Sequence, residues 1–346
     1  MSTITPAAVI PVAAPFNTSP SYSGTFIPTL WSSKLNAKFY AASTFADICN
    51  RDWEGDIKNL GDKVVINGIP SITINDYTVG SGVSYQVPTP STIEMVVDRA
   101  KYFGFQINDV LDYQSKPGLM GMFTDDASEQ MRTVLDSTCL YRTLLTAESA
   151  VGKEDGTVPA NRGATAGKRS TSYNLGTDAA PVDISAANEA LNVILRMASV
   201  LDEQNIPESG RWLLIDPATR LRLMGTNLAQ AQFMGDDKSM VRNGLIGTID
   251  RFKVYVTNQL PFKAATAVVW TSGDGSEATI AGVAHATLRT RLLAAGHTSA
   301  ISFASQMTKT EQLRNPTDFG DYVRGLQVFG HKTVKGTALA TAIFSG

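Results

Sequence analysis

TIEMVVDRAKYFGFQI, residues 92–107, is the stretch that decides the fold, because apolar and polar side chains alternate along most of its length. A repeat of two residues is the pattern of a β-strand with one buried and one solvated face. A strand this long predicts a two-stranded arm that projects and leans on a neighbour, since an isolated ribbon is only marginally stable. Ile93, Met95, Val97, Phe103, Phe105 and Ile107 share one face, which Arg99 and Lys101 interrupt, and Glu94, Asp98, Tyr102 and Gln106 share the other.

Shorter runs before this stretch extend the predicted β region back to residue 61. Each run is rich in β-branched residues, and Gly, Pro and Asn-Asp separate one from the next. The runs are DKVVINGI (62–69), SITINDYT (71–78) and VSYQVPTP (83–90). Further upstream, residues 1–30 have no period and predict an extended arm. A short helix is predicted between 28 and 52, with Leu35, Phe39 and Ala42 on one face.

The period changes to three and four residues after Pro117 and Gly118, which predicts one long amphipathic helix over 118–150. About thirty helical residues span roughly 45 Å, which is long for a globular protein. A long polar loop is predicted at 151–182. The apolar positions of the helix are Met120, Phe123, Ala127, Met131, Val134, Tyr141 and Leu145, with Thr138 filling one gap.

A compact α/β module is predicted after this loop. It begins with a helix over 184–204, continues through the buried strand RWLLID (211–216), and has Asp216 as the N-cap of the helix PATRLRLM (217–224). The strand FKVYV (252–256) closes it, with Phe252, Val254 and Val256 predicted to point inward. The remaining residues return to β patterns, with a turn predicted at GDGSE (273–277).

Composition narrows the classes of function. The chain has 346 residues, 43% of them hydrophobic, which suits roughly two compact domains or one elaborated domain. A formal net charge of -2 excludes a strong polybasic surface, so sequence-driven nucleic-acid binding is not expected. Cys49 and Cys139 are expected to be buried free thiols. The N-terminal residues are not expected to form a signal peptide, and no run of about 18 apolar residues predicts a membrane span.

Two glycine-containing segments could be taken for phosphate loops. Gly244 and Gly247, in GLIGTIDRFKVYVTNQLP (244–261), lack the third glycine and the following helix of a dinucleotide fingerprint, so a turn is predicted there. The segment GATAGKRS (163–170) has glycines one residue too close for a P-loop, and Arg169 follows Lys168 where a Ser or Thr is needed. We interpret it as a mobile basic loop.

No set of residues predicts catalysis. The histidines at 285, 297 and 331 lack the spacing of metal ligands, and neither cysteine belongs to a pair. The sequence therefore predicts no enzyme activity, no cofactor and no metal site, although catalytic groups can also converge in space from distant residues.

Four phrases in order resemble the major capsid proteins of tailed bacteriophages, which have the Hong Kong 97-type fold. The first is IPTLWSSKLNAKFYAASTFADICNRDWEGDIKNLGDKVVI (27–66), and the second is LNVILRMASVLDEQNIPESGRWLLIDPATRLRLM (191–224). The glycine-containing segment 244–261 and DYVRGLQVFGHKTV (321–334) complete the set, so the resemblance covers nearly the whole chain.

The resemblance implies an α+β fold and a division of the chain. Its parts would be an N-terminal arm, an extended β-ribbon loop lying on a neighbouring subunit, a peripheral domain with a long spine helix, an axial α/β domain, and C-terminal strands returning to the peripheral domain. The corresponding ranges would be 1–60, 61–104, 105–180, 181–300 and 301–346.

The resemblance also implies a function. The chain would self-assemble into hexamers and pentamers of an icosahedral phage head around double-stranded DNA, in the host cytoplasm, and end in the virion capsid. Its partners would be copies of itself, a portal protein and, in some particles, a cement protein. No lysine lies between Lys63 and Lys101, so a covalent crosslink from the ribbon is not expected. The short uncharged arm favours a separate scaffolding protein over a built-in one.

Two alternatives remain at this point. One is an encapsulin-like shell that packages enzymes, and a more distant one is a cytosolic nucleotide-dependent enzyme that uses the 163–170 loop. In a shell, aromatic side chains are the expected anchors of subunit contacts. The residues predicted for that role are Trp31, Trp53, Tyr77, Tyr85 and Phe103.

Overall fold

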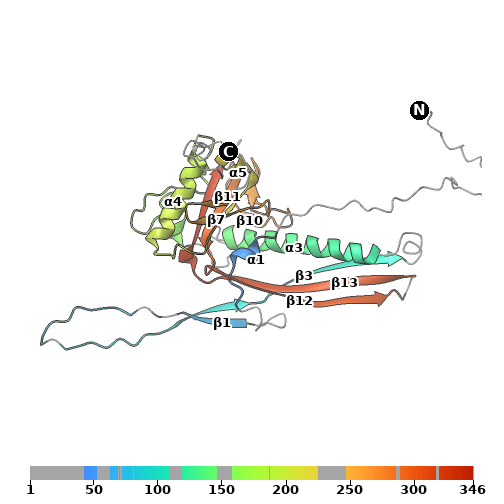
Figure 1. The fold of residues 1–346 in the computed structure, drawn as a ribbon, viewed down its shortest axis with the longest axis horizontal. Coiled ribbons are helices and arrows are strands. Elements are labelled where there is room, and N and C mark those ends of the chain that lie inside the picture. The colour runs from blue at the N-terminus through green and yellow to red at the C-terminus, as the bar shows by residue number, and fades with distance from the viewer. Residues whose placement is uncertain are drawn as a thin grey trace, which may run out of the picture.

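A computed structural model of the chain has an α+β fold in which an α/β module sits at one end of a long sheet (Figure 1). A loop between two short strands projects from the other side of the module (Figure 1). The structure describes residues 43–52, 63–68, 70, 72–80, 82–108, 119–145, 158–186, 188–224, 247–285, 289–316 and 319–345.

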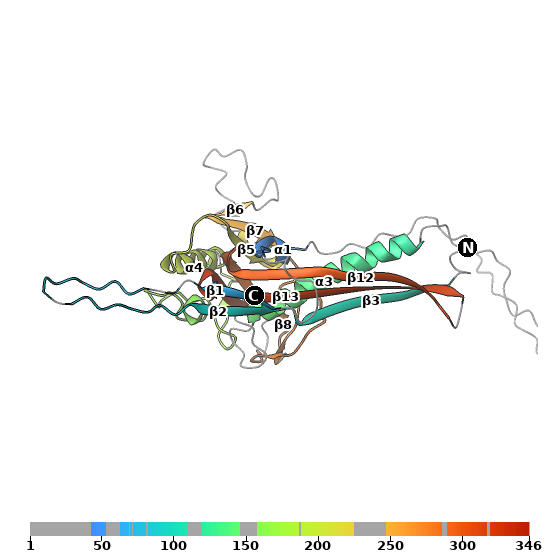
Figure 2. The same cartoon turned by 90° about the horizontal axis from the view of Figure 1, so that it is seen from below.

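The long sheet has three antiparallel strands in the order β12 (Ile301–Arg314), β13 (Gly320–Thr333) and β3 (Arg99–Asn108). Helix α3 (Leu119–Leu145) runs along it (Figures 1 and 2), and the ring of Phe123 meets that of Phe105 edge to face at 6.1 Å. Its 27 residues span about 40 Å. The predicted long helix is therefore confirmed, although residues 146–150 lie outside the described part of the chain.

The stretch 92–107 forms two strands in two sheets, so the prediction of one long ribbon strand is wrong. Strand β2 (Ser91–Val96) pairs antiparallel with β1 (Lys63–Gly68), and the chain then enters the long sheet as β3. The crossing is possible because Gly330 lies against Val96 and Val97, where a Cβ would come within 2.6 Å of a carbonyl oxygen. The predicted alternation is confirmed, because the odd-numbered residues from 93 to 107 are more buried than the even-numbered ones.

The α/β module is built on a seven-stranded sheet with a core on each face. Strand β5 (Arg211–Ile215) is buried along its whole length: Trp212 and Leu214 belong to the core shared with α3, and Leu213 and Ile215 to the core under helix α4 (Glu189–Glu203). The other strands are β4 (Val182–Asp183), β14 (Leu339–Ser345), β11 (Thr290–His297), β7 (Phe252–Val256), β6 (Thr248–Ile249) and β8 (Phe262–Lys263).

Smaller elements complete the described fold. Strands β9 (Val269–Trp270) and β10 (Ile280–Ala281) form a hairpin that holds the predicted turn at 273–277. The remaining elements are helix α1 (Phe45–Ile48), helix α5 (Pro217–Met224) and the 3-10 turns Pro159–Asn161 and Gly336–Ala338.

Several predicted boundaries in the module change. Helix α4 begins at Glu189 and not at 184, because Asp183 accepts a hydrogen bond from the backbone N–H of Ser185 and Asn188 has φ 66°. Asp216 caps α5 as predicted and accepts a 3.0 Å bond from the backbone N–H of Thr219. Val256 does not point inward, since 37% of it is exposed at the end of β7.

The predicted turn near Gly247 is made by other residues. Strands β6 and β7 are joined by Asp250, with φ 52°, and Arg251, which form the tight link of a hairpin. A Cβ on Gly247 would meet no atom within 4 Å, so the structure places no steric demand on this glycine. Gly244 lies outside the described residues.

The C-terminal residues do not all return to the long sheet, so the prediction for 301–346 is wrong for β14. All seven residues of β14 are buried, and it lies between β11 and β4 in the module. An uninterrupted apolar strand fits the centre of a sheet covered on both faces better than a sheet with a solvated face. Ala166 and Leu175 likewise belong to the core under α4, so residues 158–180 pack with the module.

Candidate assembly surfaces

The most exposed feature of the described chain is the loop that connects β1 to β2, which we call the projecting loop (residues 70–90, with 71 and 81 not described). It extends far from the rest of the molecule in both views (Figures 1 and 2). The runs 71–78 and 83–90 were predicted as strands, yet their described residues are extended without strand pairing. A bond from the backbone N–H of Thr73 to Oε1 of Gln86, 3.0 Å long, links the two arms.

The projecting loop presents apolar side chains to solvent. An aliphatic or aromatic side chain left in water forgoes about 1.5–3 kcal/mol relative to burial. Contiguous exposed apolar surface of this kind marks an interaction site in soluble proteins. The exposed large residues are Ile72, Ile74, Tyr77, Val79, Val83, Tyr85 and Val87, and the exposure of Tyr85 reaches 91%.

The predicted interface aromatics therefore divide into three groups. Tyr77 and Tyr85 lie on the projecting loop and belong to none of the core clusters formed by the described residues, which suits a contact with another molecule. Phe103 is partly buried against the core shared with α3, and its ring lies over Gly325 and 6.4 Å from that of Phe105. This contact contributes to the chain's own packing, and the interface role of Phe103 stays a prediction. Trp31 and Trp53 lie outside the described residues.

The root of the N-terminal segment is fixed by a buried carboxylate that the sequence analysis missed. Asp136 of α3 accepts bonds from the backbone N–H of Thr44 at 2.5 Å and of Phe45 at 3.3 Å, and from the hydroxyl of Ser43 at 2.8 Å. Burial raises the pKa of Asp136, and these hydrogen bonds oppose the rise. Only the neighbouring run of apolar residues in α1 could have hinted at this anchor.

The same anchor holds α1 in the core and joins the long sheet. The ring of Phe45 meets that of Phe303 edge to face at 5.3 Å. The backbone of Asn50 bonds to Ile301 and Phe303 of β12 at 2.8 and 2.9 Å. The segment 43–50 therefore bonds to both α3 and the long sheet.

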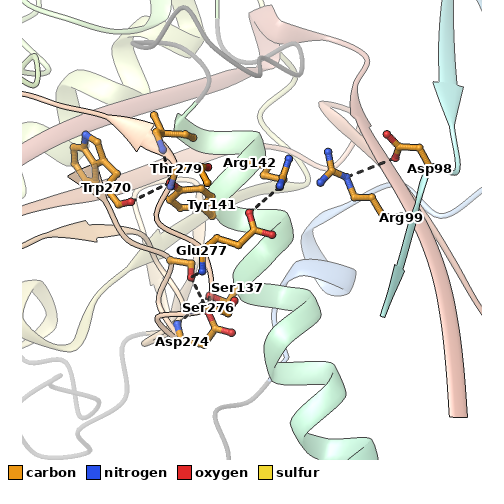
Figure 3. A network of polar contacts seen from close by, with 12 residues as sticks. Asp98, Arg99, Ser137, Tyr141, Arg142, Trp270, Asp274, Ser276, Glu277 and Thr279 are labelled. Atoms are coloured by element: carbon orange, nitrogen blue, oxygen red, sulfur yellow. Dashed lines mark hydrogen bonds and ion pairs between the residues drawn. The ribbon is translucent and has the colours of Figure 1, made fainter. Parts of the chain in front are cut away.

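A polar network fastens the 273–277 turn to α3 (Figure 3). The hydroxyl of Tyr141 donates to the carbonyl of Trp270 at 3.0 Å and accepts from the backbone N–H groups of Thr279 and Ile280. The next residue of the helix, Arg142, forms a 2.8 Å ion pair with Glu277. These bonds come from facing elements and fix the hairpin β9–β10 against the helix.

Asp274 is the second centre of this network (Figure 3). Its Oδ1 accepts bonds from the hydroxyls of Ser137 and Ser272, both 2.7 Å, and from the hydroxyl and N–H of Ser276. Burial raises the pKa of Asp274, but the hydrogen bonds outweigh it and the net shift is downward. The predicted turn at 273–277 is thus stabilised by four hydrogen bonds to one carboxylate oxygen of Asp274.

The 163–170 loop is anchored and not mobile, which corrects the sequence-based interpretation. Oε2 of Glu203 accepts bonds from the backbone N–H of Arg169 at 2.7 Å and of Ser170 at 3.2 Å, and the pKa of Glu203 is lowered mainly by the first bond. Gly167 donates its N–H to Ala160. Backbone N–H groups are what a phosphate loop offers its ligand, and here a carboxylate of the same chain occupies two of them.

The described residues offer little for metal or cofactor chemistry. Within them, no three His, Cys, Asp or Glu side chains come together in a way that could hold an ion. Cys49 and Cys139 are free and buried, as predicted, and burial raises the pKa of the Cys49 thiol. None of the helices in this part of the chain has the length and apolarity needed to cross a bilayer.

Comparison with solved structures identifies the architecture. A structure of Mycobacterium phage Che8 matches with a TM-score of 0.67 at 23% identity, over 92% of this chain and 97% of that one. The capsid of cyanophage P-SCSP1u matches with a TM-score of 0.62 at 14% identity, over 92% of this chain and 94% of that one. This chain has the Hong Kong 97-type capsid fold. The capsid of Ralstonia phage GP4 shares it, with a TM-score of 0.58 at 11% identity over 95% and 98%.

The predicted fold class is thereby confirmed, and the chain spans nearly the full length of the phage structures that it matches. No family model and no curated protein matches the sequence. At identities this low the likeness lies in the arrangement of elements, which the long sheet, α3 and the α/β module supply.

Proposed function

We propose that the chain is the major capsid protein of a tailed bacteriophage, which assembles into hexamers and pentamers of an icosahedral head around double-stranded DNA. The observation that carries this proposal is the fold shared along 92% of the chain with structures of phage particles. The apolar projecting loop supports it independently, because contact with another molecule would bury side chains that the described residues leave exposed.

The parts of the chain take distinct roles in this proposal. The module of the seven-stranded sheet serves as the axial domain around the centre of each hexamer or pentamer. The long sheet with α3 serves as the peripheral domain, and the projecting loop as the extended loop that lies on a neighbouring subunit. This assignment differs from the division expected from the sequence. It gives β14 and residues 158–180 to the axial domain and the whole of β3 to the peripheral domain.

The partners follow from the same role. Copies of the chain form the shell, a separate scaffolding protein guides its curvature, a portal protein occupies one vertex, and a cement protein binds some shells of this kind. The near-neutral charge suits close packing of like subunits and leaves DNA to non-specific contacts. Maturation without a covalent crosslink fits the absence of lysine from residues 64–100. Assembly takes place in the host cytoplasm, and the mature protein resides in the virion.

The decisive experiment is expression of the full chain with its scaffolding protein, followed by negative-stain microscopy and analysis of the contents. Closed shells that co-purify with portal protein and take up DNA are the expected result. Shells that contain a cargo enzyme would instead support the encapsulin-like compartment.

Persistent monomers with no shells or rings would overturn the shell function. Nucleotide binding that is lost in Lys168→Met would then favour the enzyme, although Glu203 already engages the amides of that loop.

A further inference from the structure

Strand β3 forms one edge of the long sheet. In the described part of the chain, β3 pairs only with β13, so the other edge of its ten residues has no strand beside it. The opposite edge strand, β12, carries an irregularity in pairing between Met307 and Lys309, a device that discourages further strand addition. No such irregularity interrupts the pairing of β3 from Arg99 to Asn108.

A glycine makes a hollow on the solvent face of this edge. Gly104 lies between the outward side chains of Tyr102, which is 79% exposed, and Gln106. The hollow has a volume of about 520 Å³, and Leu313 and Tyr322 also line it. A Cβ on Gly104 would come no closer than 3.9 Å to any atom, so the chain's own packing does not require the glycine. A glycine within a strand often marks the place where another chain approaches closely.

The projecting loop contains a segment whose sequence alternates as in a β-strand. In the arm 83–87 of the projecting loop, Val83, Tyr85 and Val87 alternate with Ser84 and Gln86, and the arm is extended but unpaired. It carries no charge, so pairing would bury no ion. The other arm is less regular, because Asn75 and Asp76 interrupt its apolar positions.

We propose that the arm 83–87 of a second copy adds as a fourth strand to the open edge of β3, with Tyr85 opposite Gly104. This placement puts Val83 and Val87 opposite Tyr102 and Gln106 in either strand direction, because side chains on one face recur every second residue. Aromatic and β-branched side chains opposite one another are favourable cross-strand pairs, and an aromatic ring opposite an edge glycine fills the missing volume.

The occupant must be another copy. The projecting loop and β3 run from the centre of the molecule in opposite directions in both views, so the loop of one chain does not reach its own β3 (Figures 1 and 2). The inference rests on the proposed shell function, which supplies neighbouring copies. It adds to that function a defined edge, a partner strand and a register.

The test is disulfide trapping between two differently tagged full-length chains that are co-expressed and assembled. One chain carries Tyr85→Cys and the other Gly104→Cys; the native cysteines are buried and do not compete. We expect a disulfide dimer in the assembled particles. The matched control replaces Gly104→Cys with Lys101→Cys, on the face of β3 toward α3, and we expect the dimer band to be lost.

A second pair of variants separates the contact from folding. Gly104→Val fills the hollow and should leave the unfolding midpoint of the unassembled chain unchanged while particle yield falls. Ala100→Val adds the same side chain to the same face away from the hollow and should leave the yield unchanged. Particles without the Tyr85–Gly104 dimer and unaffected by Gly104→Val would overturn this inference and leave the shell function standing. Failure of the wild-type chain to form particles would overturn both.

Discussion

The α/β module and the projecting loop differ in where their apolar side chains find partners. In the module, β5 and β14 are buried along their whole length between cores contributed by α3 and α4. In the loop, seven large apolar residues are mostly exposed, and a hydrogen bond from Thr73 to Gln86 links the two arms. Within the described residues, the module buries its apolar side chains and the loop leaves them exposed.

The difference has an energetic meaning for assembly. Burial of the exposed residues of the loop would contribute on the order of 10 kcal/mol, before the costs of ordering the loop and of association. In the proposed shell, this division would allow the module to fold before any neighbour arrives. Contacts that depend on neighbours then stabilise the particle without being needed for the monomer. The predictions below separate the two regions by their effect on the unassembled chain.

The largest effect is expected in the module. Trp212→Ala removes a side chain that is 2% exposed and packs against Gly296, so we expect the free energy of unfolding to fall by about 3–5 kcal/mol. Urea denaturation of the unassembled chain measures it. Leu221→Ala is the matched control, since Leu221 is 72% exposed on α5 and its truncation should cost less than about 0.5 kcal/mol. Equal losses in the two variants would contradict the assignment of the core.

An intermediate effect is expected where the module meets the long helix. Asp274→Asn weakens the bonds that Oδ1 accepts from Ser137, Ser272 and Ser276, and we expect a loss of about 1–2 kcal/mol at pH 7. Because the pKa of Asp274 is lowered by folding, the unfolded chain binds more protons below the ordinary value of 3.8. The contribution of Asp274 is therefore present above that pH and is lost as the pH falls through its folded pKa.

Unfolding of both chains at neutral pH and at progressively lower pH tests this expectation. The gap between wild type and Asp274→Asn should narrow on acidification. Asp98→Asn serves as the control, because Asp98 is 59% exposed and its contact with Arg99 is 3.6 Å long. A gap that stays constant down to the lowest pH would show that Asp274 acts through packing and not through its charge.

Local periodicity explains why much of this architecture was predictable. The alternation of residues 93–107 holds in the structure, and the three-four spacing correctly predicted a helix, although Phe123 is 42% exposed and residues 135–141 are buried on all sides. The start of α5 could be predicted from Asp216, because the capping hydrogen bond joins residues only three positions apart. Each of these features depends on residues close together in the chain.

Features that depend on distant residues were not predictable in this way. The crossing from β2 to β3 requires close approach to Gly330, more than 200 residues later in the chain. The anchoring of the N-terminal root by Asp136 and of the 163–170 loop by Glu203 likewise joins segments far apart in sequence. In the loop, the runs predicted as strands are extended, but none of the described strands pairs with them.

The smallest effect on the unassembled chain is expected in the projecting loop, and there the comparison is sharpest. Tyr85 is 91% exposed, so Tyr85→Ser should change the free energy of unfolding by less than about 0.5 kcal/mol. Its effect should appear in assembly, where truncation of an aromatic anchor costs about 2 kcal/mol per contact and raises the concentration needed to form particles. Urea denaturation of the monomer measures the free energy of unfolding, and light scattering during assembly measures the concentration needed to form particles.

Ser84→Ala, a neighbouring change on an exposed polar residue, is the control and should alter neither quantity. If Tyr85→Ser destabilised the monomer as much as Trp212→Ala, the loop would be part of the chain's own fold and the division between the two regions would fail.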